Sequence, residues 1–257
     1  MIKKIVVASF ILSTLSACGG GGGSEPTVQF STLSVLSNGD GIARGVTSSG
    51  EEALIYSPLI VDGVSSANSA SSSDIANVSA SDFPVTSVNG NARIRTGTMT
   101  SDGITINVTA VENIGTTDAA VVFLGTEAGY NDVIMVTGSA YSNPPTGSHT
   151  YSGTQMTTSS NGSAPGAIGS FSMTADFGQE TFSYNGSSGG ISVSGSGVLD
   201  TANGRYATSG LSVNNGSTNY SGTMHGLLHG NGAQATSGVF HTSGSSPAYT
   251  GSFVGSR

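Results

Sequence analysis

Short strand-like runs separated by turn-forming pairs dominate the sequence from residue 89 onward, and this pattern restricts the fold more than any other feature. The runs are rich in Val, Ile, Thr, Tyr and Phe, and Asn-Gly, Asp-Gly or Gly-Ser pairs separate them. Asn-Gly pairs accept positive φ at both central positions of a two-residue hairpin turn. Four pairs are spaced as hairpin or connector turns: Asn185-Gly186, Asn203-Gly204, Asn215-Gly216 and Asn231-Gly232. The pattern predicts antiparallel sheet.

Side chains alternate within these runs. Phe171, Met173 and Ala175 share one parity while Ser172 and Thr174 share the other, which predicts one face on a core and one face in water. Eight candidate strands cover 148–156, 168–177, 180–186, 191–199, 204–213, 218–228, 235–241 and 248–254. Four more cover 92–100, 103–111, 119–125 and 131–139, and apolar runs at 53–56 and 59–61 could add strands.

Eight antiparallel strands suffice to close a small barrel that its own side chains fill. No segment longer than two turns has a helical period. We therefore expect an all-β protein, in which a C-terminal eight-stranded antiparallel β-barrel follows a β-rich, loop-rich N-terminal region.

The first 18 residues predict export and lipid attachment. Two lysines precede an apolar run over residues 5–15, which is shorter than the roughly 20 residues that a membrane-spanning helix needs. This order predicts a cleaved signal peptide. Leu15-Ser16-Ala17-Cys18 resembles the lipobox of bacterial lipoproteins, which implies a diacylglycerol on the Cys18 thiol. The alternative is an ordinary secreted protein in which Cys18, the only cysteine, is unpaired.

The mature chain is expected to be acidic and poor in charge. Both lysines lie in the signal, so five arginines remain against fifteen acidic residues, a formal net charge of −10. This charge argues against nucleic acid as a partner. The expected segments are a signal peptide at 1–17, a lipidated Gly-rich tether at 18–26, a β-rich handle-like region at 27–140 and the barrel at 141–257. Residues 63–82 are of low complexity and are predicted to be a loop or linker.

Spaced glycines and aromatic residues near the C-terminus form a further pattern. The spacing Gly-x-aromatic-Tyr-Gly-x-x-Ala-x-Glu-x-Gly-Gly-x-Phe is matched by Gly226, Gly230, Ala233, Gly238 and Phe240. The chain departs from it at Leu228 and His229, where aromatic residues are usual, and at Ala235 and Ser237, which replace the usual Glu and Gly. Physically, glycines inside strands mark bulges or tight corners of a barrel. The cluster is therefore predicted to mark barrel corners.

Two other stretches complete a family resemblance. Asp176-Phe177 ends a strand before a turn, and Gly251 and Phe253 belong to a closing Gly-x-Phe-Gly-x-x-Arg strand. Together with the glycine spacing, these stretches resemble the small β-barrel of transferrin-binding-protein-B-like surface lipoproteins, which include factor-H-binding and haemophilin-type proteins. The N-terminal half is unmatched apart from the lipobox. The resemblance implies the barrel fold, a surface location and a protein or iron-containing ligand.

Two short patterns are candidates for chemistry. On one strand face, His225 and His229 would lie about 13 Å apart at roughly 3.3 Å per residue, too far to share one zinc ion. They stay candidates for a metal or haem role, and half-exposed barrel side chains are the alternative. Gly186-Ser187-Ser188-Gly189-Gly190 fits G-x-S-x-G but lacks the strand-to-helix context of a catalytic serine. We expect a hairpin turn there and no catalytic residue.

The expected function follows from these features. We expect a non-catalytic lipoprotein of the outer membrane or cell surface that binds a protein or an iron-containing ligand. Its expected contacts are the membrane, through the lipid on Cys18, and that ligand, with no cofactor besides the lipid. The alternative is a structural or adhesive envelope lipoprotein with no solute-binding role, which a Gly/Ser/Thr-rich sheet with few charges suits equally well.

Overall fold

The computed structural model describes residues 34–35, 42–46, 51–56, 60–61, 64–65, 82–101, 104–115, 119–126, 133–159, 166–242 and 247–257. The predicted signal peptide, Cys18 and the tether lie outside the described residues. None of the described residues belongs to a helix long and apolar enough to cross a membrane.

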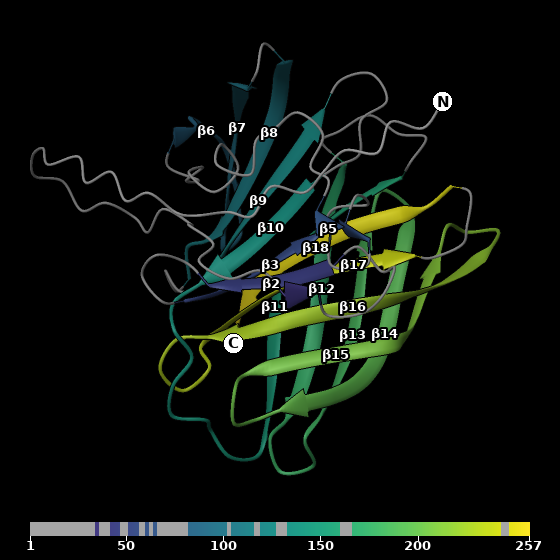
Figure 1. The fold of residues 1–257 in the computed structure, drawn as a ribbon. Coiled ribbons are helices and arrows are strands. Elements are labelled where there is room, and N and C mark those ends of the chain that lie inside the picture. The colour runs from purple at the N-terminus through teal and green to yellow at the C-terminus, as the bar shows by residue number, and fades with distance from the viewer. Residues whose placement is uncertain are drawn as a thin grey trace, which may run out of the picture.

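The C-terminal part is a closed antiparallel barrel (Figure 1). Its strands pair in chain order, and the last pairs with the first. They are β11 (Ser148–Ser159), β12 (Ala167–Asp176), β13 (Thr181–Ser188), β14 (Ile191–Asp200), β15 (Arg205–Asn214), β16 (Asn219–His229), β17 (Ala235–Thr242) and β18 (Tyr249–Ser256). The all-β fold and the eight-stranded barrel are thus confirmed, and each observed strand overlaps its predicted range.

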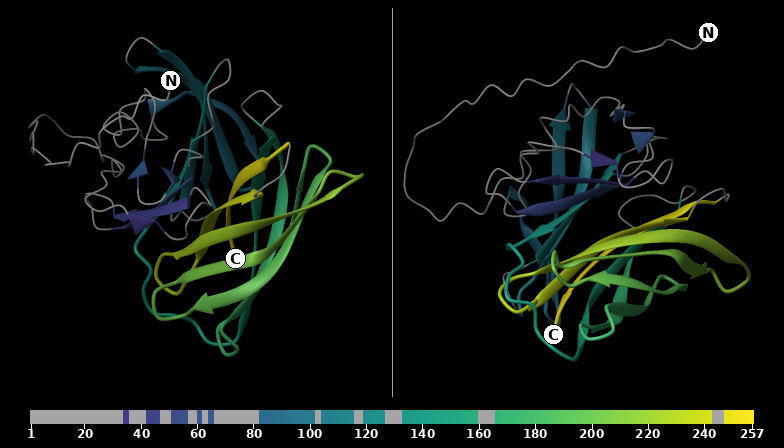
Figure 2. Two further views of the ribbon diagram at one scale, coloured as in Figure 1. Left: turned by 45° about the vertical axis from the view of Figure 1, so that its right-hand side comes forward. Right: turned by 60° about the horizontal axis from the view of Figure 1, so that its bottom comes forward.

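An eight-stranded antiparallel sheet precedes the barrel and lies against its outer wall (Figure 2). In spatial order it contains β1 (Ser34–Val35), β2 (Ile42–Val46), β3 (Glu52–Tyr56), β10 (Val133–Gly138), β9 (Ala119–Thr126), β8 (Ile104–Asn113), β7 (Ala92–Ser101) and β6 (Val85–Asn89). A separate short pair joins β4 (Ile60–Val61) to β5 (Val64–Ser65). The meander β6 to β10 therefore shares one sheet with strands from the start of the chain.

Aromatic rings and glycines face each other inside the barrel. Direct cross-strand partners are Gly153 with Phe171, Phe182 with Gly197, Tyr184 with Gly195, Tyr206 with Gly226, Gly238 with Phe253, and Phe240 with Gly251. A Cβ built on Gly226 would lie 2.0 Å from Cζ of Tyr206, and one on Gly251 would lie 2.2 Å from Cζ of Phe240. Glycine is needed at these two positions because the partner ring occupies the space of a side chain. Alternating large and small residues fill the narrow interior.

The pairing corrects the prediction that Gly226 and Gly238 mark bulges or corners. These two glycines are direct partners in an unbroken ladder between β16 and β17. The register shifts lie elsewhere, between Ser194 and Val198 in the β14–β15 pairing and between Thr208 and Leu211 in the β15–β16 pairing. The prediction failed because a glycine that accommodates a ring and a glycine that permits a bulge look identical in sequence.

A second hydrophobic core joins the sheet to the barrel. Leu54, Ile134 and Val136 of the sheet belong to one buried cluster with Val239 and Val254 of the barrel wall. Strands β3, β8, β9 and β10 contact β16, β17 or β18. Every residue of β18 is buried, because its inner face lines the barrel and its outer face lies under the sheet. The expectation of one core with a wet outer face holds for β13, whose side chains alternate between buried and exposed.

The turns follow the predicted chemistry with one exception. Gly204 (φ 65°), Gly216 (φ 90°) and Gly232 (φ 76°) have the positive φ expected of their Asn-Gly pairs. The pair Asn185-Gly186 instead lies inside β13, and Gly189 (φ 57°) and Gly190 (φ 80°) form the β13–β14 turn. Two glycines in succession adopt the double positive φ of this turn more easily than Asn-Gly does.

Candidate functional site

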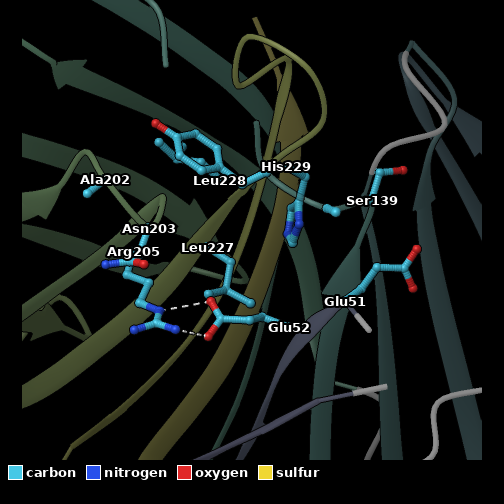
Figure 3. Close-up of a pocket in the computed structure, with 11 residues that line it drawn as sticks. Glu51, Glu52, Ser139, Ala202, Asn203, Arg205, Leu227, Leu228 and His229 are labelled. Carbon is cyan, nitrogen blue, oxygen red and sulfur yellow. Dashed lines mark hydrogen bonds and ion pairs between the residues drawn. The ribbon is translucent and has the colours of Figure 1, made fainter. Parts of the chain in front are cut away.

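An open cleft with a volume of about 260 Å³ lies at the seam between sheet and barrel (Figure 3). The start of β3, the segment after β10, the β14–β15 turn and the end of β16 line it. The lining residues are Glu51, Glu52, Ser139, Ala140, Tyr141, Ala202, Asn203, Arg205, Leu227, Leu228 and His229. Polar and ionisable side chains therefore come together from both parts of the molecule, in a chain with only 9% charged residues.

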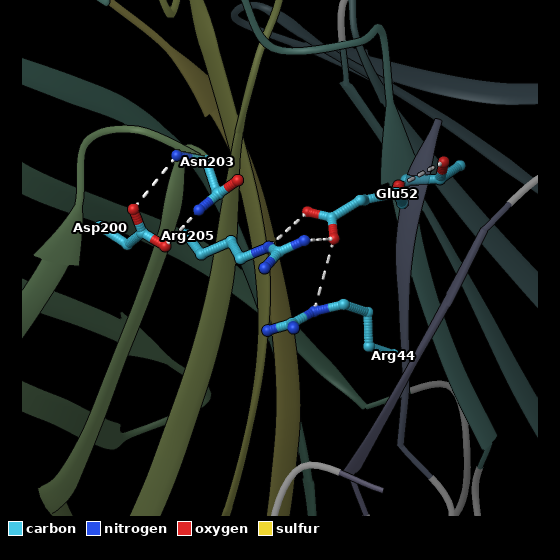
Figure 4. Close-up of polar contacts among 6 residues, drawn as sticks. Arg44, Glu52, Asp200, Asn203 and Arg205 are labelled. Carbon is cyan, nitrogen blue, oxygen red and sulfur yellow. Dashed lines mark hydrogen bonds and ion pairs between the residues drawn. The ribbon is translucent and has the colours of Figure 1, made fainter. Parts of the chain in front are cut away.

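An ion pair across the seam borders the cleft. Arg205 of β15 donates from Nε to Oε2 of Glu52 at 2.9 Å and from Nη2 to Oε1, so that both carboxylate oxygens are engaged (Figure 4). The hydrogen bond to Glu52 raises the pKa of Arg205. A two-point fork of this kind fixes orientation as well as charge. Glu52 and Arg205 thus hold the sheet and the barrel in one relative position.

A second arginine approaches the same carboxylate from the sheet. Arg44 of β2 places Nε 3.6 Å from Oε1 of Glu52, and among the described residues this buried nitrogen has no hydrogen-bond partner. Burial lowers the pKa of Arg44, and the charge of Arg205 lowers it further. Asp200 is the last residue of β14, and hydrogen bonds from the Asn203 side chain and from the Ala202 and Asn203 backbone lower its pKa.

Arg93, Arg95 and Glu112 repeat this arrangement within the sheet. Arg95 Nε donates to Glu112 Oε2 at 2.7 Å, and Arg93 Nη1 lies 3.5 Å from the same oxygen. Arg95 also donates to the Phe83 carbonyl at 2.8 Å. Four of the five arginines in the chain therefore share two glutamates. None of these three residues lines the cleft, so this second triad offers a matched control for it.

His229 is buried at the edge of the cleft. Its Nε2 lies 2.7 Å from the Ser237 hydroxyl, and it also hydrogen bonds with the backbone of Ser139. Burial lowers the pKa of His229 to about 4, so the neutral ring is present at pH 7. A serine beside a histidine can form a nucleophilic pair, but Ser237 is fully buried. The two side chains therefore form a buried contact at the seam.

His225 and His229 both belong to β16, where His225 is half-buried and His229 is buried. They lie four residues apart. His241 contacts Tyr56 across the seam, with its Nδ1 3.3 Å from the Tyr56 hydroxyl, and His149 contacts Arg257. Among the described residues, no group of three or more His, Cys, Asp or Glu side chains could hold a metal ion.

The serines of the G-x-S-x-G stretch lie at the end of a strand. Ser188 is buried inside the barrel, donates to Thr157 Oγ1 at 2.5 Å and accepts a hydrogen bond from Gln155 Nε2 at 3.0 Å. Tyr184 completes the network by donating to Gln155 Oε1 at 2.7 Å. These groups satisfy one another, as buried polar groups must. They form a polar layer of the barrel core.

The remaining motif residues have structural positions. Asp176 accepts hydrogen bonds from the backbone of Gly178 and Gln179 and so closes the β12–β13 turn, and Phe177 is buried beside it. Gly230 (φ 80°) and Ala233 (φ 56°) shape the β16–β17 connection. The Ala233 carbonyl accepts a hydrogen bond from Tyr151 at 2.8 Å.

Sequence reasoning missed the residues that characterise the cleft. Glu52 and Arg205 lie 153 positions apart, and neither belongs to a motif. The only available signal is the small number of arginines. In a chain with so few cationic residues, each arginine is a candidate for a specific contact. That signal does not say which acidic residue pairs with which arginine.

This chain is similar in fold to several solved structures. No protein-family model and no curated protein sequence matches this chain. The intact Ap-TbpB (N and C lobes) is 16% identical with a TM-score of 0.47, over 66% of this chain and 39% of that one. Isotype 1 transferrin binding protein B from serogroup B Neisseria meningitidis is 15% identical with a TM-score of 0.46, over 63% and 36%. A structure described as a surface lipoprotein is 12% identical with a TM-score of 0.42, over 86% and 99%. The matched part of this chain spans about two fifths of the length of the first two.

Proposed function

We propose that this protein is a lipid-anchored, non-catalytic protein of the outer membrane or cell surface that binds a protein partner at the seam between its sheet and its barrel. One observation carries the proposal: charged side chains from both parts of a charge-poor molecule meet in one open cleft, whose volume is about 260 Å³. Clefts between structural units with a few convergent polar groups are common binding sites.

The barrel interior is not the proposed binding site. Aromatic rings fill it, and Phe253 lies with its centroid 5.0 Å from that of Phe171 and 4.7 Å from that of Tyr184. The cleft itself is smaller than the roughly 300–1,000 Å³ of pockets that enclose drug-sized ligands. A ligand with a contact area larger than the cleft provides must also bind the outer surface around the seam. This favours a macromolecule, such as an iron-carrying protein, as the ligand.

The anchor is supported by the lipobox alone. Metabolic labelling of cells with an alkyne-bearing palmitate should label the protein, and Cys18→Ala should abolish the label. Protease treatment of intact cells should then degrade the protein if it faces outward. Labelling of the Cys18→Ala variant at the level of the parent chain would contradict the anchor, and complete resistance to protease in intact cells would contradict the surface location.

Binding is tested with the mature chain carrying Cys18→Ser. Immobilised protein should give saturable binding to a host iron protein, for which transferrin is the first probe because it appears in the names of similar structures. Arg205→Glu places like charges at the seam and should abolish that binding, whereas Arg93→Glu, in the triad that does not line the cleft, should not. Lack of saturable binding to transferrin, lactoferrin and haemoglobin would refute the proposal.

The structural or adhesive alternative is favoured by the outer barrel wall. Ser172 of β12, Asn185 of β13, Ser194 of β14 and Ser212 of β15 form one cross-strand row. A parallel row contains Ser170, Ser187, Ser192 and Asn214. These rows present hydroxyl and amide groups without charge. Loss of envelope integrity or of cell adhesion in a deletion strain, together with no ligand binding, would select this alternative.

A further inference from the structure

Glu52 has two arginine neighbours but forms hydrogen bonds with only one of them. Arg205 engages both carboxylate oxygens, whereas Arg44 stays 3.6 Å from one of them. Arg44 lies directly opposite Leu54 in the β2–β3 pairing, so Arg44 and Glu52 are diagonal neighbours on one face of the sheet. Side chains at such positions are within reach of each other. Glu52 can therefore move to Arg44 without any change in the backbone of the sheet.

The observed position of the Arg44 side chain is energetically unfavourable. Its Nε is buried without a hydrogen-bond partner among the described residues, and the charge of Arg205 opposes its own. A buried donor without a hydrogen-bond partner costs free energy, and the cost is larger when the donor belongs to a charged group than when it belongs to a neutral one. Besides Glu52, the carboxylate whose charge acts on Arg44 is that of Asp200, which is bonded to its own turn. A second anion between the two arginines would remove this cost.

The site suits a carboxylate. A guanidinium fork matches the two oxygens of a carboxylate in one plane, and Arg205 lies in the cleft lining and already binds such a group from Glu52 (Figure 4). The whole cleft has a volume of only about 260 Å³, and the acidic chain repels polyanions. A single carboxylate therefore fits better than an acidic polymer.

We propose that a carboxylate of the ligand binds Arg205 in place of Glu52, and that Glu52 passes to Arg44 as it does so. This inference rests on the proposed function, because it assigns a ligand chemistry to the same cleft. The carboxylate comes either from a free small acid or from an acidic side chain of a protein partner. Exchange of partners lets the ligand bind without leaving Glu52 unpaired at the seam.

Arginine side-chain NMR tests the proposal residue by residue. The mature Cys18→Ser chain contains five arginines, so its Nε–Hε spectrum contains five signals. Titration with acetate and succinate should shift the Arg205 and Arg44 signals and leave those of Arg93 and Arg95 in place. Sodium chloride at equal ionic strength should shift none of them. Equal shifts from chloride, or no shift at Arg205, would overturn the proposal.

A second titration identifies the source of the carboxylate. A short peptide with one internal Glu is compared with the same peptide carrying Gln and with succinate. Tighter binding of the Glu peptide than of succinate supports a protein partner, and the reverse order supports a free small acid. Equal shifts of the Arg205 signal by the Glu and Gln peptides would overturn a role for the carboxylate.

Variants separate ligand binding from a purely structural ion pair. Glu52→Gln removes the competing carboxylate and should tighten acetate binding about fivefold, the upper range for a partly exposed ion pair. Glu112→Gln makes the same change in the triad that does not line the cleft and should leave the affinity unchanged. Arg205→Lys keeps the charge but loses the fork and should weaken binding. Equal affinities of Glu52→Gln and the parent, or equal gains in both Gln variants, would contradict the exchange.

The outcomes also separate this inference from the proposed function. Saturable binding of a protein partner without any response of Arg205 to carboxylates would overturn the inference alone. A specific response of Arg205 to carboxylates without any protein partner would overturn the proposed function alone. The first NMR titration uses the parent chain and needs no variant. The proposal can therefore be tested even if a variant fails to fold.

Discussion

Lowering the pH from 7 toward 4 is expected to remove stability that depends on the neutral form of His229. Burial at the seam lowers the pKa of His229 to about 4 in the folded protein, against about 6.5 in an unfolded chain. Between these values the unfolded chain binds the proton and the folded protein does not. Stability is therefore complete above pH 6.5 and falls as the pH drops toward 4.

The magnitude follows from the size of the pKa shift. A shift of about 2.5 units at about 1.36 kcal/mol per unit gives a loss of about 3 kcal/mol between pH 6.5 and 4. The slope approaches 1.4 kcal/mol per pH unit within this window. This is a large part of the roughly 5–15 kcal/mol that stabilises a typical domain.

Urea unfolding at a series of pH values measures the effect. The chain has no Trp and eight Tyr, so tyrosine fluorescence and far-UV circular dichroism are the signals. Carboxylates also titrate in this range, so the quantity of interest is the difference between the parent chain and His229→Gln, which should shrink as the pH falls. His149→Gln, outside the seam, is the matched control for the loss of an imidazole. Parallel stability curves for the parent and His229→Gln from pH 7 to 4.5 would refute the reasoning.

Two further predictions concern the barrel core, and urea unfolding at pH 7 tests both. Gly226→Ala places a methyl group 2.0 Å from Cζ of Tyr206 and should destabilise the fold by about 1–3 kcal/mol. Gly210→Ala would place its methyl group no closer than 3.5 Å to a neighbouring atom, Oγ1 of Thr208, and should change stability by less than about 0.5 kcal/mol, so equal effects would contradict the steric argument. Tyr184→Phe removes the donor to Gln155 Oε1 and should cost about 1–3 kcal/mol. An unchanged midpoint would show that the amide finds another partner.

Local chemistry explains why the strands were predictable. Alternation along β12 and β13 has period two, and turns at Gly204 and Gly216 need positive φ, so neighbouring residues alone specify both features. The error at Asn185-Gly186 arose because two adjacent stretches could each form the turn. Only pairing with β12 and β14 decides between them, and that pairing is not local information.

The seam was not predictable because it depends on contacts between distant segments. The outward residues of β18 read as a mixture of Thr, Ser and Val, and nothing in that mixture says that a sheet covers them. The same holds for Arg205, whose partner Glu52 lies on a strand near the other end of the chain. A sequence pattern indicates which face is apolar, but it does not indicate which other element packs there.

The position of β18 has a consequence for the order of folding. Phe253 belongs to the barrel core and Val254 to the seam core, while β18 pairs with β11 across about a hundred residues of chain. Neither core can be completed until Tyr249–Ser256 is available, and contacts of such long sequence separation form slowly. A chain that emerges N-terminus first would therefore stay open until its last strand arrives. Such delay suits a protein with a predicted signal peptide, since a chain must be unfolded to be threaded through a narrow export channel.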